Sequence, residues 1–250
     1  MNDLTDPLRG SRALVTGGAM RLGRETAIGL AERGVHVVIH YRRSAQAARE
    51  LALEVTRMGV QAWTVHADLA DPEQAVQMFE RARELAGPLD LLINSASIFP
   101  ESRLATVTWG ELEENLRVNA FSPFVLGRVF ANQGREGAMV NFLDTRILDY
   151  DSAHVAYHLS KRMFFTFTRM MALEFAPRIR VNAVAPGLVL PPVGKDRSYL
   201  EARAGSIPLK KPGAARDVVD AALFLASSDF VTGQVIFVDG GRHMLHGAYG

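Results

Sequence analysis

Short apolar runs alternate with longer stretches of helical periodicity along almost the whole chain. The apolar runs predict strands over residues 13–16, 35–40, 61–66, 89–94, 138–142, 180–183 and 235–238. The stretches between them predict helices over residues 22–33, 45–58, 72–86, 109–132, 153–175 and 215–226. Alternation of helices with strands that are apolar on both faces is typical of a parallel sheet covered on both sides. The sequence therefore predicts an α/β fold with three layers: a single domain over residues 1–250, with a seven-stranded parallel sheet flanked by helices.

The composition limits the class of protein. Hydrophobic residues make up 48% of the chain, which is enough for a large core, and the formal net charge of +1 gives no reason to expect nucleic acid or an anionic membrane as a partner. The chain has no cysteine, so it forms no disulfide and offers no thiolate to a metal or a substrate. Residues 1–10 lack the apolar segment of a signal peptide, and no apolar run reaches the length of about 18 residues needed for a membrane span. We expect a cytoplasmic protein.

Tyr157 and Lys161 lie four residues apart in the predicted helix 153–175. Positions i and i+4 share one face of a helix, with Cβ atoms about 5–6 Å apart. A lysine ammonium beside a phenol favours the phenolate, so we expect the pKa of Tyr157 to lie below its usual value of about 10, in the range useful for proton transfer. Because such pairs also occur by chance on exposed helices, the interpretation depends on a second motif.

That second motif is a glycine turn between the first predicted strand and the first predicted helix. It reads Thr16-Gly17-Gly18-Ala19-Met20-Arg21-Leu22-Gly23. Such a turn offers backbone N–H groups and a helix dipole to a pyrophosphate. A phosphate cradle together with a tuned phenol indicates a nicotinamide enzyme that reduces or oxidises a polarised double bond.

The end of the second predicted strand indicates which nicotinamide cofactor is used. It reads His40-Tyr41-Arg42-Arg43-Ser44, and no acidic residue follows before Glu50. NAD enzymes of this architecture place an acid about 20 residues after the glycine turn, where it holds the ribose 2′-hydroxyl. Two arginines and a serine instead suit a 2′-phosphate, which favours NADP(H).

Further motifs resemble those of the short-chain dehydrogenase/reductase family, and the resemblance extends over nearly the whole chain. They are Asn94-Ser95-Ala96-Ser97, Asn119, the stretch 181–187 that ends in Pro186-Gly187, and Val238-Asp239-Gly240-Gly241. The resemblance implies a Rossmann fold and assigns Asn119, Tyr157 and Lys161 to the catalytic site. Together with the residues described above, it gives a set of expected cofactor contacts: Thr16, Gly17, Arg21, Leu22, Gly23, His40, Tyr41, Arg42, Arg43, Ser44, Asp68, Leu69, Asn94, Ser95, Ala96, Tyr157, Lys161, Pro186, Gly187 and Leu188.

Two departures from the family pattern point to its pteridine reductase branch, which includes dihydromonapterin reductases. Arg21 stands where the family usually has a third glycine, and Asp144 stands where it usually has the catalytic serine. With Ser97 and Phe99, these residues resemble the pterin site of that branch, in which the arginine contacts pyrophosphate and pterin and the phenylalanine stacks on the pterin ring. The expected substrate contacts are therefore Arg21, Ser97, Phe99, Asp144 and Tyr157. A second interpretation is that Asp144 caps a turn and the adjacent Thr145 supplies the hydroxyl. Val189 occupies a place where some pteridine reductases have serine.

The resulting hypothesis is an NADPH-dependent reductase that converts a 7,8-dihydropterin, of the dihydromonapterin or dihydrobiopterin type, into a tetrahydropterin. Tyr157 donates or relays a proton, Lys161 tunes it and holds the nicotinamide ribose, Asn119 orders water, and Asp144 orients the substrate. One alternative is an NADPH-dependent carbonyl reductase, for example of 3-oxoacyl thioesters. Another is an NADP(H)-binding sensor without turnover.

The predicted helix 153–175 is apolar on nearly every side, which indicates burial on more than one side. We expect it to join subunits into a homodimer or homotetramer. The stretch 188–207 resembles the substrate lid of the family. His154 and His158 share a helix face but have no third ligand nearby, so a structural role is favoured over a metal site, and His243 and His246 are interpreted in the same way.

Overall fold

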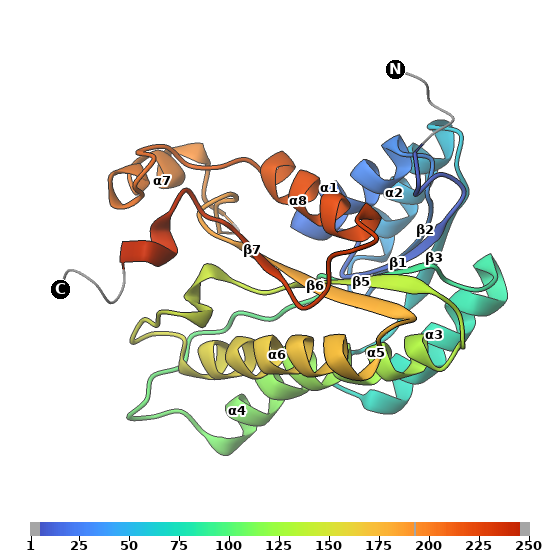
Figure 1. Ribbon diagram of the computed structural model, residues 1–250. Helices are drawn as coiled ribbons and strands as arrows, with labels where there is room; N and C mark the ends of the chain where they lie inside the picture. Colours follow the sequence, from blue (N-terminus) through green and yellow to red (C-terminus); the bar gives the residue numbers. More distant parts are fainter. Residues whose placement is uncertain (1–5, 193, 246–250) are drawn as a thin grey trace.

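Seven parallel strands form one sheet, and helices cover both of its faces (Figure 1). The computed structural model describes residues 6–192 and 194–245. Within these residues the strand order is β3-β2-β1-β4-β5-β6-β7, and every neighbouring pair is parallel. The strands are β1 (Arg12–Thr16), β2 (His36–Tyr41), β3 (Ala62–His66), β4 (Leu91–Asn94), β5 (Gly137–Phe142), β6 (Ile179–Pro186) and β7 (Val235–Val238). The predicted fold class is confirmed.

The helices lie in two layers. On one face of the sheet lie α1 (Arg21–Glu32), α2 (Ala45–Arg57) and α8 (Ala215–Ser227) (Figure 1). On the other lie α3 (Pro72–Ala86), α5 (Ser122–Ala131) and α6 (Val155–Glu174), with α4 (Trp109–Leu116) against α6. The order of the strands reverses between β1 and β4, so a crevice opens there at the carboxyl ends of the strands, where folds of this kind bind ligands.

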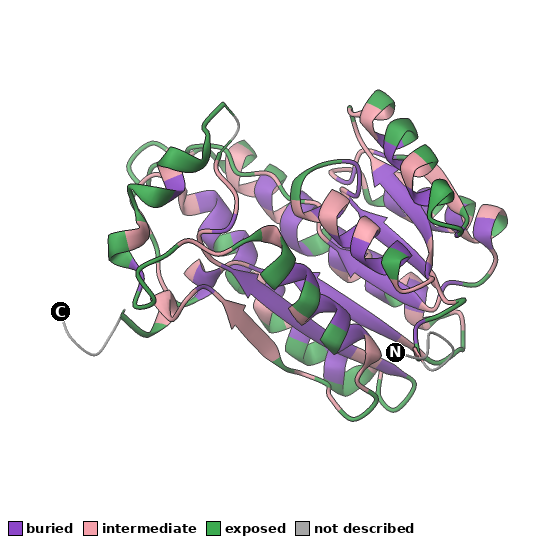
Figure 2. Cartoon of the chain, turned by 90° about the horizontal axis from the view of Figure 1, so that it is seen from above, coloured by how far each residue is buried: buried purple, intermediate pink, exposed green. Residues whose placement is uncertain are grey.

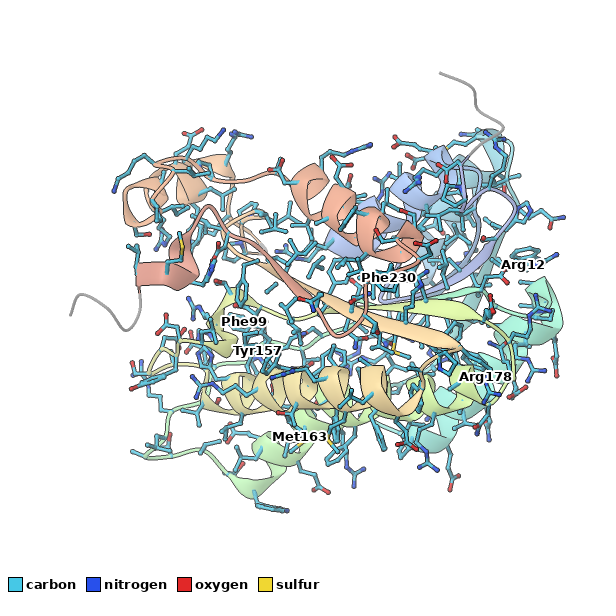
Figure 3. All side chains as sticks on the ribbon, in the orientation of Figure 1. Arg12, Phe99, Tyr157, Met163, Arg178 and Phe230 are labelled. Atoms are coloured by element: carbon cyan, nitrogen blue, oxygen red, sulfur yellow. The ribbon has the colours of Figure 1, made fainter. Side chains whose placement is uncertain are left out.

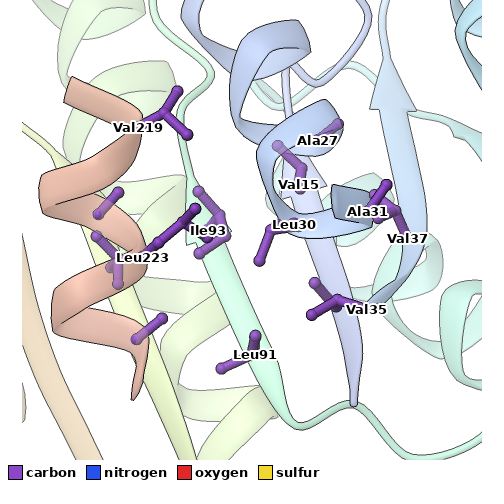
Figure 4. Close-up of a cluster of buried hydrophobic side chains, with 14 of the residues drawn as sticks. Val15, Ala27, Leu30, Ala31, Val35, Val37, Leu91, Ile93, Val219 and Leu223 are labelled. Carbon is purple, nitrogen blue, oxygen red and sulfur yellow. The ribbon is translucent and has the colours of Figure 1, made fainter. Parts of the chain in front are cut away.

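Each face of the sheet has its own apolar core, because a strand with side chains on both faces must be covered twice. One core joins α1 and α8 to the sheet through residues such as Leu30 and Leu223 (Figure 4). The other contains Phe79, Phe130 and Phe164. Burial is continuous along the central strands and gives way to exposure on the outer faces of the helices (Figure 2). The two cores hold the carboxyl ends of the strands in fixed register, and these ends form the site described below.

The prediction of a single helix over residues 109–132 is wrong. The chain forms α4, then a π-helical turn (Arg117–Phe121), then α5. In that turn the N–H of Ser122 donates to the carbonyl of Arg117, five residues earlier. Asn119 lies in the turn and is fully buried. Contacts of Asn119 with distant segments hold the wider turn, and helical periodicity alone does not reveal them.

The lid predicted over residues 188–207 contains a short helix, α7 (Arg197–Glu201), and a 3-10 turn (Ala204–Ser206); residue 193 lies outside the described residues. The sequence pattern predicted neither element. β6 extends over Ile179–Pro186, longer than the predicted 180–183, and so reaches the cavity. Within the described part of the chain, no helix is long and apolar enough to cross a membrane.

Candidate active site

A cavity of about 620 Å³ opens at the carboxyl edge of the sheet, beside the point where the strand order reverses. Its wall is formed by the glycine turn, the ends of β2, β4 and β5, the first half of α6, and residues 186–192. Tyr199 of α7 and Arg242 close it from the lid side. Its volume lies in the range of cofactor and small-molecule pockets.

Gly17 and Gly23 leave no room for a side chain in the glycine turn. Gly17 has φ +61°, and a Cβ on it would lie 2.9 Å from the Cα of Ala96. A Cβ on Gly23 would lie 2.3 Å from the carbonyl oxygen of Gly17. The close approach of the turn to β4 and to the start of α1 therefore requires glycine at both positions, as expected for a backbone that approaches a pyrophosphate.

His40 fixes this turn. Its Nδ1 accepts a hydrogen bond from the N–H of Gly17 (3.0 Å), its carbonyl accepts one from the N–H of Gly18 (2.9 Å), and its Nε2 lies 3.1 Å from the carbonyl oxygen of Ala67. Burial lowers the pKa of His40 to about 4, which keeps the ring neutral. His40 lines the cavity, as predicted, but its ring positions the turn. The N–H groups left for a phosphate are those at the start of α1, which lack intrahelical partners.

Arg21 occupies a position suited to glycine, because its φ is +53°. Its side chain crosses to the lid, where Nη2 donates a hydrogen bond to the carbonyl of Pro191 (2.9 Å). Arg21 thus lies between the phosphate turn and the lid and lines the cavity.

The end of β2 provides the polar wall predicted from the sequence. Tyr41, Arg42, Arg43 and Ser44 all line the cavity. Ser44 precedes α2 without capping it, which leaves its hydroxyl available for a ligand. Arg42 lies 3.5 Å from the carboxylate of Asp68, a partner that the local sequence does not indicate.

Four predicted cofactor residues lie outside the cavity wall: Thr16, Asp68, Leu69 and Asn94. Thr16 Oγ1 accepts hydrogen bonds from the N–H groups of Ser95 (3.0 Å) and Ala96 (3.1 Å) and so shapes the end of β4. Asn94 Nδ2 donates to Asn141 Oδ1 (2.9 Å) behind the site. The side chain of Leu69 is part of the core. The other predicted cofactor residues all line the cavity, including Leu22, Ser95, Ala96, Pro186, Gly187 and Leu188.

Tyr157 and Asp144 meet at the centre of the cavity. The Tyr157 hydroxyl donates a hydrogen bond to Asp144 Oδ2 (2.8 Å), and Asp144 Oδ1 accepts one from the N–H of Arg146 (2.8 Å). Asp144 therefore caps the turn that follows β5 with one oxygen and contacts the phenol with the other. The hydroxyl of Thr145 donates to Asp239 instead (2.5 Å). Thr145 lines the cavity, but its hydroxyl proton is held by Asp239.

The pKa of Tyr157 is raised well above its usual value, which is opposite to the expectation. Burial is the main cause, and the adjacent carboxylate of Asp144 adds to it. Lys161 is buried on the same helix face, but Nζ donates to the carbonyl of Phe142 (2.7 Å) and not to the phenol. Burial lowers the pKa of Lys161 to about 8. In this environment the phenol of Tyr157 stays protonated.

Asn119 has no side-chain atom left for a ligand. Oδ1 accepts from Ser97 Oγ (3.1 Å) and from the N–H of Ile98 (2.9 Å). Nδ2 donates to the carbonyl of Ile98 (3.0 Å) and to Ser160 Oγ (3.0 Å). Asn119 thus ties the segment after β4 to α6, and it is a positioning residue for the residues beside it.

Phe99 lies directly beside Tyr157 (Figure 3). The two rings meet edge to face with centroids 4.5 Å apart, and one face of Phe99 stacks on the ring of His154 at 3.9 Å. Half of Phe99 remains exposed, and both Phe99 and Ser97 line the cavity. The predicted substrate residues Arg21, Ser97, Phe99, Asp144 and Tyr157 therefore share one cavity.

The histidines near the site bond to Asp151 and Asp239. His154 Nδ1 lies 2.9 Å from Asp151 Oδ1, and His158 Nε2 accepts from the N–H of Asp151 (3.0 Å). His243 pairs with Asp239, and His246 lies outside the described residues. No cluster of three metal-ligating side chains occurs in the part of the chain that the structure describes.

Three polar residues of the cavity are not among those predicted from the sequence: Arg146, Tyr199 and Arg242. Arg146 forms an ion pair with Asp151. Arg242 directly follows the motif Val238-Asp239-Gly240-Gly241, and this adjacency was the one signal available. Val189 is buried and contributes an apolar surface to the wall.

Comparisons with known proteins agree with this architecture. A family model described as enoyl-(acyl carrier protein) reductase matches residues 17–243. A short-chain type dehydrogenase/reductase from Picea abies is 33% identical, over 94% of this chain and 93% of its own length. The solved structure of FolM alternative dihydrofolate reductase 1 from Brucella canis, complexed with NADP, is 31% identical with a TM-score of 0.87, covering 94% and 95% of the two chains. A blue fluorescent protein from a metagenomic library, solved with NADPH, is 30% identical with the same TM-score, over 94% and 99% of the chains. The chain belongs to the short-chain dehydrogenase/reductase family of oxidoreductases.

Proposed function

We propose that this protein is an NADPH-dependent reductase of a dihydropterin. The hydrogen bond from the Tyr157 hydroxyl to Asp144 carries the proposal. A ketone oxygen that gains negative charge needs donors around it, and the carboxylate of Asp144 opposes that charge. A ring with amino and lactam N–H groups instead finds in Asp144 an acceptor and in Phe99 an aromatic face. Both side chains lie beside the proton donor Tyr157.

The cavity fits NADPH. The glycine turn excludes any Cβ at Gly17 and Gly23, as a pyrophosphate cradle requires. Arg43 and the free hydroxyl of Ser44 lie where the 2′-phosphate of the adenosine ribose would be held. When bound, NADPH supplies a hydride. Lys161 would hold the nicotinamide ribose, and the buried ammonium would favour proton loss from Tyr157 when the substrate takes that proton.

In the proposed reaction, this chain's residues deliver a proton and orient the ring. Asp144 accepts hydrogen bonds from the substrate, while its second oxygen stays bonded to the N–H of Arg146 and keeps the carboxylate in place. Tyr157 provides the proton that the reduced C=N bond needs. Phe99 is held by its stack on His154, so the aromatic face is fixed before the substrate arrives.

The Brucella canis relative supports the proposal, because it is named an alternative dihydrofolate reductase and was solved with NADP. The second candidate is a carbonyl reductase, which the varied reductase names of other relatives favour, for example versicolorin reductase from Emericella nidulans. The test is NADPH oxidation with purified protein and four substrates: dihydromonapterin, dihydrobiopterin, dihydrofolate and a 3-oxoacyl thioester. We expect activity on the dihydropterins and little on the thioester. The reverse pattern would assign carbonyl reduction, and NADPH binding without turnover of any substrate would assign a sensor.

We also propose that α6 joins subunits into a homodimer or homotetramer. Leu159, Met170 and Leu173 of α6 are 49%, 58% and 84% exposed, and Phe121 lies beside the ring of Phe167 at the same surface. Burying such apolar area stabilises an association. Light scattering of the purified protein should give a mass of two or four chains, and Leu173→Glu should lower it. A monomeric wild type would refute this assembly.

A further inference from the structure

We propose that the substrate carries an anionic arm, a carboxylate or a phosphate, and that Arg242 binds it. The inference rests on the function proposed above and adds the chemical class of the substituent on the reduced ring. Cationic side chains outnumber acidic ones in the wall of the cavity. Among the described residues of its wall, six are cationic and one is acidic: Arg21, Arg42, Arg43, Arg146, Lys161 and Arg242, against Asp144.

Bound NADPH accounts for four of these cations. Its pyrophosphate and 2′-phosphate together carry about four negative charges. Arg42 and Arg43 lie at the adenosine end, Arg21 lies at the glycine turn, and Lys161 lies beside Tyr157. Two arginines at the substrate end remain. Arg146 forms an ion pair with Asp151, whereas Arg242 forms no ion pair with any described residue.

The side chain of Arg242 has no hydrogen-bond or ion-pair partner among residues 6–192 and 194–245. It is partly buried in the cavity wall, and it does not extend freely into solvent as an ordinary surface arginine does. A half-desolvated guanidinium without a partner gains most from a charge-assisted bond, and its planar fork matches a carboxylate or phosphate.

The backbone beneath Arg242 is held firmly. Asp239 accepts hydrogen bonds from the Thr145 hydroxyl (2.5 Å) and from the N–H of His243 (2.7 Å), and the N–H of Arg242 donates to the carbonyl of Asp239 (3.3 Å). Because Thr145 follows Asp144 directly, the chain that carries Arg242 is tied to the segment that orients the ring. The backbone that carries Arg242 is thus held against the segment that contains Asp144, and Arg242 lines the same cavity.

The lid adds to the positive potential at this end. The lid, residues 188–207, contains three cationic side chains and two acids, and Lys210 and Lys211 follow it directly, while the whole chain has a net charge of only +1. The guanidinium of Arg203 stacks on the ring of Tyr199, which itself lines the cavity, at 3.6 Å. A positive rim attracts anionic ligands and raises their association rate in a way that salt suppresses.

The experiment compares substrates that differ in the charge of the arm. The probes are dihydromonapterin, which is neutral, its phosphate monoester, and dihydrofolate, which carries carboxylates. For each we would measure kcat/KM with NADPH, and also Kd by calorimetry with NADP⁺ bound, where no turnover occurs. The proteins are the wild type, Arg242→Gln, Arg242→Lys and, as a matched control, Arg178→Gln, an exposed arginine at the opposite end of the molecule (Figure 3).

We expect Arg242→Gln to weaken binding and kcat/KM for the anionic probes by about tenfold relative to the neutral one, the loss of one charge-assisted bond. Arg242→Lys should recover part of this loss, and Arg178→Gln should leave Kd and kcat/KM unchanged for every probe. Added salt should reduce kcat/KM more for the anionic probes than for the neutral one. A preference confined to the phosphate ester or to dihydrofolate identifies the arm. Equal effects of Arg242→Gln on charged and neutral probes would overturn the inference and leave the proposed function standing. Failure of all three pterins to be reduced would overturn the function itself.

Discussion

Replacing Asp144 with asparagine removes the charge at the centre of the site and keeps the shape of the side chain. The amide oxygen can still accept from the N–H of Arg146, so the turn after β5 keeps its cap. The amide NH₂ takes the place of Oδ2 and is a donor. The Tyr157 hydroxyl, which donates to Oδ2 at 2.8 Å, then meets a donor instead of an acceptor. A substrate N–H meets the same reversed polarity.

The size of the effect follows from the bond that is lost. A hydrogen bond to a charged group contributes about 1.5–3 kcal/mol, equivalent to a factor of about 10 to about 150. We expect kcat/KM for a dihydropterin to fall by that factor in Asp144→Asn. Ketone reduction should hold steady or rise, because the negative charge that opposes the oxyanion is gone. Asp144→Ser should act in the same direction, and its hydroxyl can still accept from the N–H of Arg146, because serine is as good an N-cap as aspartate.

The assay is NADPH oxidation by both variants with a dihydropterin and with a ketone, over a range of pH. Asp144 contributes to the raised pKa of Tyr157, so in Asp144→Asn the alkaline limb of the pH profile that reports Tyr157 should move to lower pH. Equal loss on both substrates would mean that Asp144 only supports Tyr157. Robust ketone reduction by the wild type, without dihydropterin activity, would refute the reasoning altogether.

Three further predictions concern the cofactor end and the proton donor. Arg42→Ala and Arg43→Ala should each raise KM for NADPH about tenfold and leave KM for NADH nearly unchanged, with the smaller effect at Arg42 because Asp68 already shares its charge; equal weakening of both cofactors would place the 2′-phosphate elsewhere. Tyr157→Phe should lower kcat by about 10²–10⁴ with little change in NADPH affinity by fluorescence titration, and near-normal turnover would exclude Tyr157 as the donor. His40 stays neutral in the fold down to about pH 4, whereas the unfolded chain binds a proton near pH 6.5, so the free energy of unfolding should fall by about 3 kcal/mol as pH drops through this window. Urea denaturation should show a flatter pH dependence in His40→Asn, and an unchanged slope would contradict the assignment.

The sequence predicts those elements that have a regular apolar periodicity and those residues that lie in a recognisable motif. The seven strands follow from apolar runs, and the glycine turn, Tyr157 and Arg43 lie in the cavity because the carboxyl ends of parallel strands share one edge of the sheet. Side-chain spacing on α6 correctly placed Tyr157 and Lys161 on one face. Spacing says nothing about burial, however, and burial together with Asp144 reversed the expected direction of the Tyr157 pKa.

The unpredicted features depend on partners that are distant along the chain. His40 reaches Gly17 and Ala67, each more than 20 residues away. Arg242 enters the cavity only because β7 ends beside the lid. No local pattern encodes either arrangement, since each arises when separate strand ends are brought together by packing.

The π-helical turn at Arg117–Phe121 makes the length of this segment as important as its composition. A π-helical turn holds one residue more than the α-helical turn it replaces, so deleting one residue here would return the segment to regular α-helix. Leu126 and Phe130 would keep their places in the core, and Asn119 would leave Ile98. Relatives that differ here by a one-residue insertion or deletion should therefore differ in the geometry around Ser97, even where every side chain of the cavity is identical.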